Sequence, residues 1–202
     1  MFFSFDGLDG VGKTTQRALF LDWLRRAGRQ VVSCQDPGST PLGEAIREIL
    51  LGHKVPLSPT SEMLLFMAAR AQLVEEVIRP SLEDGKTVVS DRYLLANVVY
   101  QGHAGGLDVD TVWRIGEVAT GGLMPDLVFV LDMPPQAAAA RIARQLDRLE
   151  SRGTEYRARL RQGYLTEAGK DPQRIIVVDA ARDIDAVQAD IRAAAARLLN
   201  PS

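Results

Sequence analysis

The chain has 202 residues, 46% of them hydrophobic and 25% charged, which is typical of a globular protein of one domain, residues 1–202. The formal net charge of −2 excludes a strong overall field that would attract nucleic acid or an anionic membrane surface. The single cysteine, Cys34, excludes an internal disulfide, and no run approaches the roughly 18 apolar residues of a membrane span. We therefore expect a cytoplasmic protein with no nucleic-acid partner and no membrane partner.

Short apolar runs alternate with stretches of helical periodicity along the chain. The apolar runs predict strands at 2–6, 30–34, 87–90, 127–131 and 174–178. The periodic stretches predict helices near 13–27, 42–51, 60–80, 94–101, 109–120, 135–145, 154–168 and 184–199. Asp108 and Asp183 are expected as N-caps, and Gly28 and Gly52 as helix ends.

This alternation of strands and helices predicts an α/β fold. Specifically, we expect a doubly wound, five-stranded parallel sheet with helices on both faces. Ligands of such sheets bind beyond the carboxyl ends of the strands. Functional side chains should therefore follow the strands.

A glycine-rich octet follows the first predicted strand. It matches the pattern G-x-x-x-x-G-K-[ST] in full and reads Gly7-Leu8-Asp9-Gly10-Val11-Gly12-Lys13-Thr14. A loop of this kind, followed by a helix, presents unpaired N–H groups and a positive dipole to phosphate. Lys13 would reach the β- and γ-phosphates of a nucleotide, and the Thr14 hydroxyl would bind Mg²⁺. A chance tight turn is the alternative, and the strand and helix around the octet disfavour it.

Polar residues also follow the second, third and fourth predicted strands. Asp36-Pro37 follows the second, ahead of a helix that carries Arg47, and Asp91-Arg92 follows the third. Asp132 follows the fourth. Each has an ordinary explanation as a turn, a local ion pair or a helix cap. Their convergence at one edge of the sheet favours a binding site.

Phe66 and Arg70 lie four residues apart and therefore share one face of the long third helix. A ring beside a guanidinium could stack on a base and hydrogen-bond its edge. The alternative is a core phenylalanine beside a solvated arginine, and the helix alone favours that alternative.

An arginine stripe is predicted further along the chain. Its members, Arg141, Arg144, Arg148 and Arg152, are spaced three, four and four residues apart. Like charges at this spacing repel one another on a helix unless an anion lies between them. The stripe is either a solvated face, balanced by Asp147 and Glu150, or a binding site for polyphosphate.

Several motifs of the chain, between Phe2 and about Ala180, resemble those of the thymidylate kinase family. FDGLDGVGKTT resembles FEGxDGxGKTT, and DPGSTPLGEAIREILL resembles EPGGTPLGExIRxLLL. LLFMAARAQ and SDRYLLANVVYQG resemble the family's LLFxAxRAQ and DRYxxSxxAYQG. PDLVFVLDMPPQ, LDRLE and RQGYL also match, in the same order.

The resemblance implies a fold of the P-loop NTPase and nucleotide kinase type. It also implies an ATP-dependent nucleoside monophosphate kinase that uses Mg²⁺, phosphorylates dTMP to dTDP and forms a homodimer. It implies catalytic roles for Asp9, Lys13, Arg92 and Arg144. ATP would contact Gly7, Leu8, Asp9, Gly10, Val11, Gly12, Lys13, Thr14, Thr15, Arg141, Arg144 and Arg182, and Mg²⁺ would contact Thr14 and Asp9. The dTMP site would comprise Asp36, Pro37, Arg47, Phe66, Arg70, Asp91, Arg92, Asn97, Tyr100 and Gln101.

Within that site the resemblance places Phe66 and Arg70 at the thymine, Tyr100 under the deoxyribose, and Arg92 with Arg47 at the phosphate. A small lid segment near 141–153 would close on ATP.

The chain departs from the family pattern at a few positions. Asp6 stands where Glu is usual, Gln35-Asp36 where Arg-Glu is common, and Ser39 where Gly is common. The lid is about one residue shorter than usual and lacks its glycine.

Two other functions are alternatives to a thymidylate kinase. A deoxynucleoside kinase or another nucleotide kinase of the same fold would need a base for a hydroxyl acceptor, with Asp6 the candidate. A non-catalytic nucleotide-binding switch should carry an Asn-Lys-x-Asp motif, which the sequence lacks.

Overall fold

The computed structural model describes residues 1–52, 56–142 and 152–199. Five strands form one parallel sheet in the order β2-β3-β1-β4-β5, as the alternation of strands and helices predicts. Their bounds are Phe2–Gly7, Val31–Gln35, Thr87–Asp91, Leu127–Asp132 and Ile175–Asp179 for β1 to β5. The doubly wound α/β prediction is therefore confirmed.

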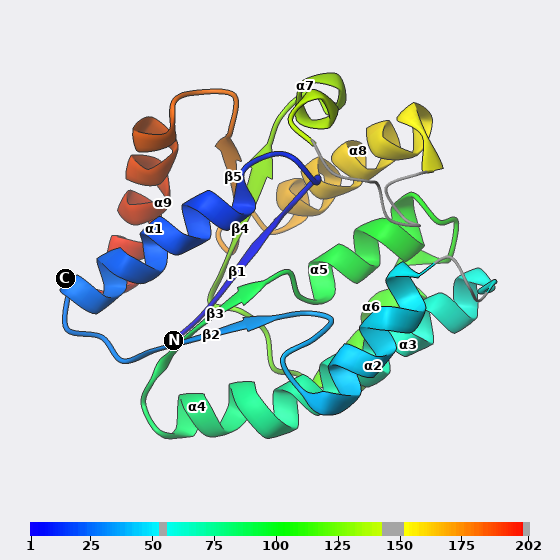
Figure 1. The fold of residues 1–202 in the computed structure, drawn as a ribbon, viewed down its shortest axis with the longest axis horizontal. Helices are drawn as coiled ribbons and strands as arrows, with labels where there is room; N and C mark the ends of the chain where they lie inside the picture. Colours follow the sequence, from blue (N-terminus) through cyan, green and yellow to red (C-terminus); the bar gives the residue numbers. More distant parts are fainter. Residues whose placement is uncertain (53–55, 143–151, 200–202) are drawn as a thin grey trace.

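The helices cover both faces of this sheet (Figure 1). Helices α1 (Lys13–Arg26) and α9 (Ile184–Leu199) pack together on one face. Helices α5 (Leu94–Asn97) and α8 (Thr154–Lys170) lie on the other, with α3 (Pro59–Leu73) and α6 (Val109–Thr120) packed outside α5. The remaining helices are α2 (Pro41–Leu51), α4 (Arg79–Glu83) and α7 (Pro135–Ala140).

Alternation along β1 divides the core between the two faces. Phe3 and Phe5 pack against Phe20 of α1, with ring centroids 5.2 and 5.5 Å away. Phe2 points to the opposite face and meets Tyr93 edge-on at 4.9 Å. All these side chains are buried. Burial on both faces explains why β1 reads as a continuous apolar run rather than an alternating one.

Two predicted helices differ from the structure because each contains a π-helical turn. The predicted helix 60–80 is α3, a turn η1 (Val74–Ile78) and then α4. Pro80 lacks the N–H that an α-helix would pair with the carbonyl of Glu76, and the widened turn directly precedes it. The predicted helix 94–101 is α5 followed by the turn η2 (Val98–His103).

The predicted helix ends agree with the structure. Asp108 accepts a hydrogen bond from the Thr111 N–H at 2.8 Å, and Asp183 accepts one from the Ala186 N–H at 2.8 Å. Gly28 has a φ of +78° just after α1, and Gly52 caps α2. The predicted helix 135–145 is too long, since α7 ends at Ala140 and residues 141 and 142 are not helical. Residues 143–145 lie outside the described ranges. None of the described helices combines the length and apolar character needed to cross a membrane.

Helix α8 approaches η2 closely at Gly163. A Cβ atom there would lie 2.8 Å from the Cβ of His103 and 3.1 Å from a methyl group of Val99. Glu167, one turn further along α8, accepts hydrogen bonds from the Trp113 indole N–H at 3.1 Å and the Lys170 ammonium at 2.7 Å. Its carboxylate also lies 2.7 Å from Nε2 of His103. The absence of a side chain at Gly163 therefore lets α8 hold η2 in place.

We expect Gly163→Ala to lower the free energy of unfolding by about 1–3 kcal/mol, because backbone and side chains must shift to admit the methyl group. Gly169→Ala is the matched control, since Gly169 lies in the same helix and a Cβ there meets nothing within 4 Å. Because alanine favours the helix more than glycine does, Gly169→Ala should raise the free energy of unfolding by up to about 1 kcal/mol. Urea unfolding of both variants checks the prediction, and equal effects would contradict it.

Candidate active site

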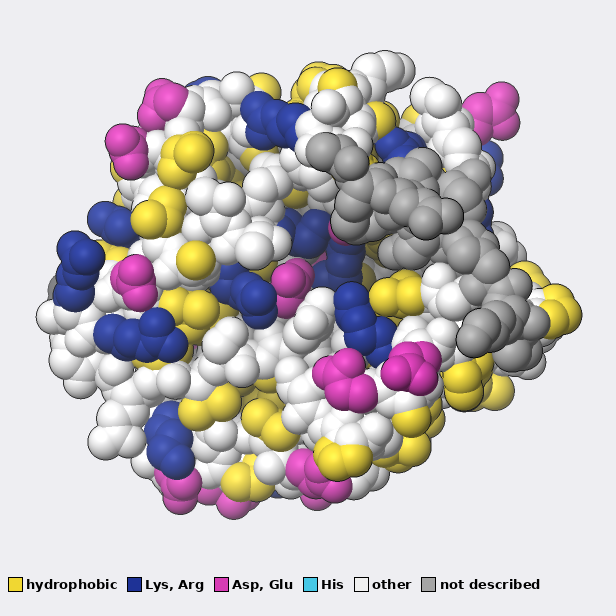
Figure 2. All heavy atoms as spheres, viewed as in Figure 1, with side chains coloured by type: hydrophobic (Ala, Val, Ile, Leu, Met, Phe, Trp, Pro, Cys, Tyr) yellow, Lys and Arg dark blue, Asp and Glu magenta, His cyan; other side chains and the backbone are white. Residues whose placement is uncertain are grey.

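The carboxyl ends of β1, β2 and β3 open onto one cavity of about 440 Å³. In Figure 2, Lys and Arg side chains and a neighbouring acidic side chain meet in a hollow near the middle of the face shown. Most of the predicted site residues line this cavity: Asp9, Gly10, Gly12, Lys13, Thr14, Asp36, Pro37, Arg47, Phe66, Arg70, Asp91, Arg92, Asn97, Tyr100, Gln101 and Arg141. The sheet thus brings together residues that are far apart in the sequence.

The glycine-rich loop connects β1 to α1 at one end of the cavity. Gly7, Gly10 and Gly12 all have positive φ, at 126°, 89° and 96°. At Gly10 a Cβ atom would lie 2.1 Å from the carbonyl oxygen of Ala138, so no other residue fits there without moving α7. Gly12 is the N-cap of α1. The loop therefore has the curvature and the helix N-terminus that a phosphate site requires.

Lys13 is buried beside this loop. Its ammonium donates to the carbonyls of Leu8 at 2.7 Å and Gly7 at 3.2 Å, and it lies 3.4 Å from the Asp9 carboxylate. Burial lowers the pKa of Lys13 below its ordinary value. Held by carbonyl groups and a carboxylate, this cation is available to bind an anion that enters the cavity.

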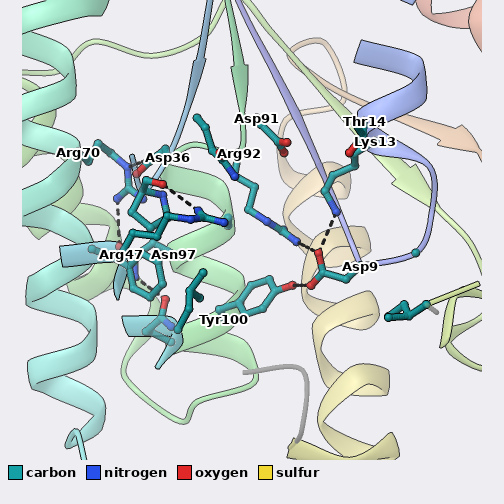
Figure 3. A pocket seen from close by; sticks show the side chains of 18 of the residues that line it. Asp9, Lys13, Thr14, Asp36, Arg47, Arg70, Asp91, Arg92, Asn97 and Tyr100 are labelled. Carbon is teal, nitrogen blue, oxygen red and sulfur yellow. Dashed lines mark hydrogen bonds and ion pairs between the residues drawn. The ribbon is translucent and has the colours of Figure 1, made fainter. Parts of the chain in front are cut away.

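Arg92 extends from the end of β3 across the cavity to Asp9 (Figure 3). Its Nη2 lies 2.7 Å from the Asp9 carboxylate, and its Nη1 donates to the Gly7 carbonyl at 2.9 Å and the Tyr164 hydroxyl at 3.1 Å. The guanidinium also lies over the ring of Tyr100, 5.1 Å from its centroid. Arg92 has a φ of +67°, a strained conformation for a residue with a side chain.

Asp9 therefore lies between two cations. Burial alone would raise the pKa of Asp9, but Arg92 and Lys13 together hold it well below its usual range. The Tyr100 hydroxyl donates to the same carboxylate at 3.3 Å. Asp9 is thus ionised, and its charge offsets those of Lys13 and Arg92.

The far end of the cavity holds a second polar group built on Arg70. Arg70 as a whole residue is 1% exposed, so the alternative of a solvated arginine is wrong. Its Nε donates to Asp36 at 2.6 Å, and its Nη1 donates to the Asn97 side chain at 3.0 Å. Phe66, one turn earlier on α3, lines the same cavity. An apolar ring and a fixed donor therefore lie together, as a planar heterocycle would require.

Arg47 and Asp91 lie on the other walls. Arg47 reaches across from α2 and donates to the Pro37 carbonyl at 2.9 Å. Asp91, at the end of β3, lies 3.6 Å from Arg17 of α1. The charged side chains of Arg47 and Asp91 therefore line the same cavity as Arg92.

Some predicted residues lie elsewhere. Gly7, Leu8, Val11 and Thr15 belong to the loop or the start of α1 but do not line the cavity. Arg182 is ion-paired with Asp190 and Asp179 on the surface. Arg144 lies outside the described residues, as does most of the predicted lid.

The arginine stripe differs from its prediction at both described ends. Arg141 follows the last residue of α7, and Arg152 precedes α8, so neither lies within an α-helix. Arg152 is ion-paired with Glu62 at 2.6 Å. At this end of the stripe the positive charge of Arg152 is balanced by the buried Glu62 carboxylate rather than by a polyphosphate.

Asp6 does not face the cavity, although it follows the apolar part of β1. It is fully buried, accepts from Ser4 at 2.8 Å and lies 3.4 Å from the Tyr164 hydroxyl. Burial raises the pKa of Asp6 to about 6. Its place behind the loop argues against Asp6 as the base of a hydroxyl acceptor.

Two site-supporting residues were missed in the sequence. Tyr164 holds Arg92, and Glu62 accepts a hydrogen bond from Gln101 at 2.8 Å. Glu62 lies four and eight residues before Phe66 and Arg70, so helical spacing could have placed it on their face. Tyr164 lies in the RQGYL motif, and nothing local connects it with Arg92.

Comparison with known proteins supports one family. The sequence profile described as thymidylate kinase matches residues 5–191. A thymidylate kinase of Symbiobacterium thermophilum is 45% identical over 194 residues, which cover 95% of this chain and 91% of that protein. One from Deinococcus radiodurans is 44% identical over 196 residues, covering 96% and 95%.

The fold gives the same result. The crystal structure of thymidylate kinase from Ehrlichia chaffeensis superposes with a TM-score of 0.80 and 27% sequence identity, covering 99% of this chain and 98% of that one. The cavity with its phosphate loop, the match along most of the chain and the similarity of fold agree. The chain belongs to the thymidylate kinase family, whose members phosphorylate dTMP with ATP as the phosphoryl donor.

Proposed function

We propose that the cavity binds dTMP with its base at the Arg70 end and its phosphate at the Arg92 end. The γ-phosphoryl group of ATP, held by the glycine-rich loop, is transferred to that phosphate. The observation that carries the proposal is the continuity of the cavity from Lys13 to Arg70, with Arg92 between them. A loop for the donor phosphates and a pocket for a flat base therefore share one space.

The acceptor needs no general base in this scheme. The second pKa of a phosphate monoester is about 6, so at neutral pH the acceptor is mostly a dianion. The barrier lies in bringing two polyanions together, and cations reduce it. Lys13, Arg92 and Arg47 supply positive charge at the donor end and the middle of the cavity.

Arg92 changes partner when dTMP binds. Its guanidinium lies against Asp9, 2.7 Å away, and has two N–H donors in a fork that fits a phosphate. Asp9 then remains beside Lys13, where it positions the reacting groups. Tyr100, whose ring lies against Arg92, occupies the space below the deoxyribose.

The residues present fit Mg²⁺. Hydroxyl and carboxylate oxygens suit this ion, and the side chains of Thr14 and Asp9 both line the cavity. These two residues would hold it, and the bound ion would neutralise charge on the donor phosphates. Arg141 would contribute on the donor side. The roles of Arg144 and Arg182 at ATP, a homodimer and a cytoplasmic location stay predictions.

We expect dTMP to be the preferred acceptor. A coupled assay with ATP and Mg²⁺ across dTMP, dUMP, dCMP, dGMP and thymidine should give the highest kcat/KM for dTMP. Thymidine lacks the phosphate that Arg92 and Arg47 are proposed to bind, so faster turnover of thymidine would contradict both roles.

We expect Arg92→Ala to lower kcat/KM for dTMP by at least about 10²-fold, because a charge-assisted contact to phosphate is lost in a desolvated site. Arg25→Ala is the control, since Arg25 lies on the exposed surface of α1, where its guanidinium pairs with Asp22. Steady-state kinetics and thermal unfolding should be measured on both. An Arg92→Ala protein that is folded and fully active would contradict the proposal.

We expect Tyr100→Ala to narrow the gap in kcat/KM between deoxyribo- and ribonucleotide acceptors, because space for a 2′-hydroxyl is opened. Tyr100→Phe keeps the ring and loses only the hydroxyl that donates to Asp9, so it should keep the gap. If both variants keep the wild-type gap in kcat/KM between deoxyribo- and ribonucleotide acceptors, the sugar is recognised elsewhere.

A further inference from the structure

Glu62 is a buried carboxylate to which the proposed mechanism gives no role. It lies on α3, on the helix face that carries Phe66 and Arg70, and is 1% exposed. Its Oε1 accepts from Nε2 of Gln101 at 2.8 Å, and its Oε2 accepts from Nη2 of Arg152 at 2.6 Å. One side chain thus connects the lining of the cavity to the surface.

A chain of directed hydrogen bonds runs from Arg70 to Glu62. Arg70 donates to Oδ1 of Asn97 at 3.0 Å, and Nδ2 of Asn97 donates to Oε1 of Gln101 at 2.6 Å. Gln101 then donates to Glu62. Figure 3 shows the start of this chain, where Asn97 approaches Arg70.

The two ends of the chain determine how its amides point. A guanidinium can only donate, and an ionised carboxylate can only accept. Each amide in between accepts a hydrogen bond through its oxygen and donates one through its nitrogen, so all the hydrogen bonds in the chain point from Arg70 toward Glu62. The oxygen of Asn97 must therefore face Arg70, and the nitrogen of Gln101 must face Glu62.

The orientation of these amides matters for the choice of base. Asn97 and Gln101 both line the cavity. Thymine presents an N3–H donor beside its O4 acceptor, whereas cytosine presents an N3 acceptor beside an N4–H₂ donor. An amide that turns over exchanges donor and acceptor at one place, and so changes which base it complements.

We propose that Glu62 is a positioning residue for base specificity, which holds Gln101 and through it Asn97 in the orientation that suits thymine. The inference rests on the proposed function, in which the base lies at the Arg70 end of the cavity. A different role for Glu62 would be purely structural, as the partner of Arg152 in an ion pair.

Two double variants separate these roles. Glu62→Gln/Arg152→Met removes both charges but leaves a carbonyl oxygen at position 62 for Gln101. Glu62→Met/Arg152→Met removes the same charges and also the acceptor. Because Glu62 and its partner Arg152 are replaced together, no lone charge stays buried at position 62, so both variants are expected to fold.

The measurement is the ratio of kcat/KM for dTMP to that for dCMP, together with the thermal midpoint. The two variants should have similar midpoints because both lack the ion pair. The ratio should stay within about twofold of wild type in Glu62→Gln/Arg152→Met. It should fall about tenfold or more in Glu62→Met/Arg152→Met, where the Gln101 amide has lost its acceptor.

Three outcomes count against these ideas in different ways. Equal ratios in the two variants would overturn the role of Glu62 in specificity. Failure of Glu62→Met/Arg152→Met alone to fold would also overturn it, because the acceptor would then be needed for folding. A wild-type enzyme that does not prefer dTMP to dCMP would contradict the proposed function instead.

Discussion

The cavity depends on one carboxylate, Asp9, placed between two buried cations. Lys13 and Arg92 come from different strand ends and would repel each other across the loop. Moving such charges out of water costs several kcal/mol each unless an anion lies beside them. Asp9 supplies that anion in the structure described, and we propose that the dTMP phosphate takes its place beside Arg92 during turnover. Without this carboxylate both cations would lose their direct ion pair, although Asp91 still acts on each of them from further away.

The order of the strands in the sheet brings Arg92 close to Asp9 and Lys13. Strand β1 lies between β3 and β4, and Phe5 of β1 is paired in register with Asp91 of β3. Arg92, the residue after Asp91, is therefore level with Asp6, directly before the glycine-rich loop, and its side chain is long enough to reach Asp9. Because β2 lies beyond β3, Asp36 emerges next to the same edge and meets Arg70. Backbone pairing thus sets the spacing of the charges.

Residues whose role follows from local sequence were predicted well. The apolar runs give all the strands, and the glycine pattern gives the phosphate loop, because each depends on neighbours along the chain. The π-helical turns were not predicted, since they depend on Pro80 and on how η2 packs against α8. Tyr164 was missed for a similar reason, because its partner Arg92 is 72 residues away and long-range pairing leaves no periodic signal. Helical spacing could have placed Glu62 on the face of Phe66 and Arg70, but its bond to Gln101, 39 residues away, leaves no such signal. Arg152 was placed in a stripe because spacing alone cannot reveal a buried partner.

The ion pair of Arg70 and Asp36 has a consequence for how this pocket can diverge. Their side chains are 2% and 0% exposed, so each depends on the other to remain buried. Substituting either alone removes the direct partner of a buried charge, at a cost of about 3–5 kcal/mol, which is a large share of the roughly 5–15 kcal/mol that stabilises a typical domain. We therefore expect new base preferences at this position to require a change of both residues together, or earlier substitutions that add stability. Selection for a stable fold would then favour keeping the pair even where selection on the substrate is relaxed.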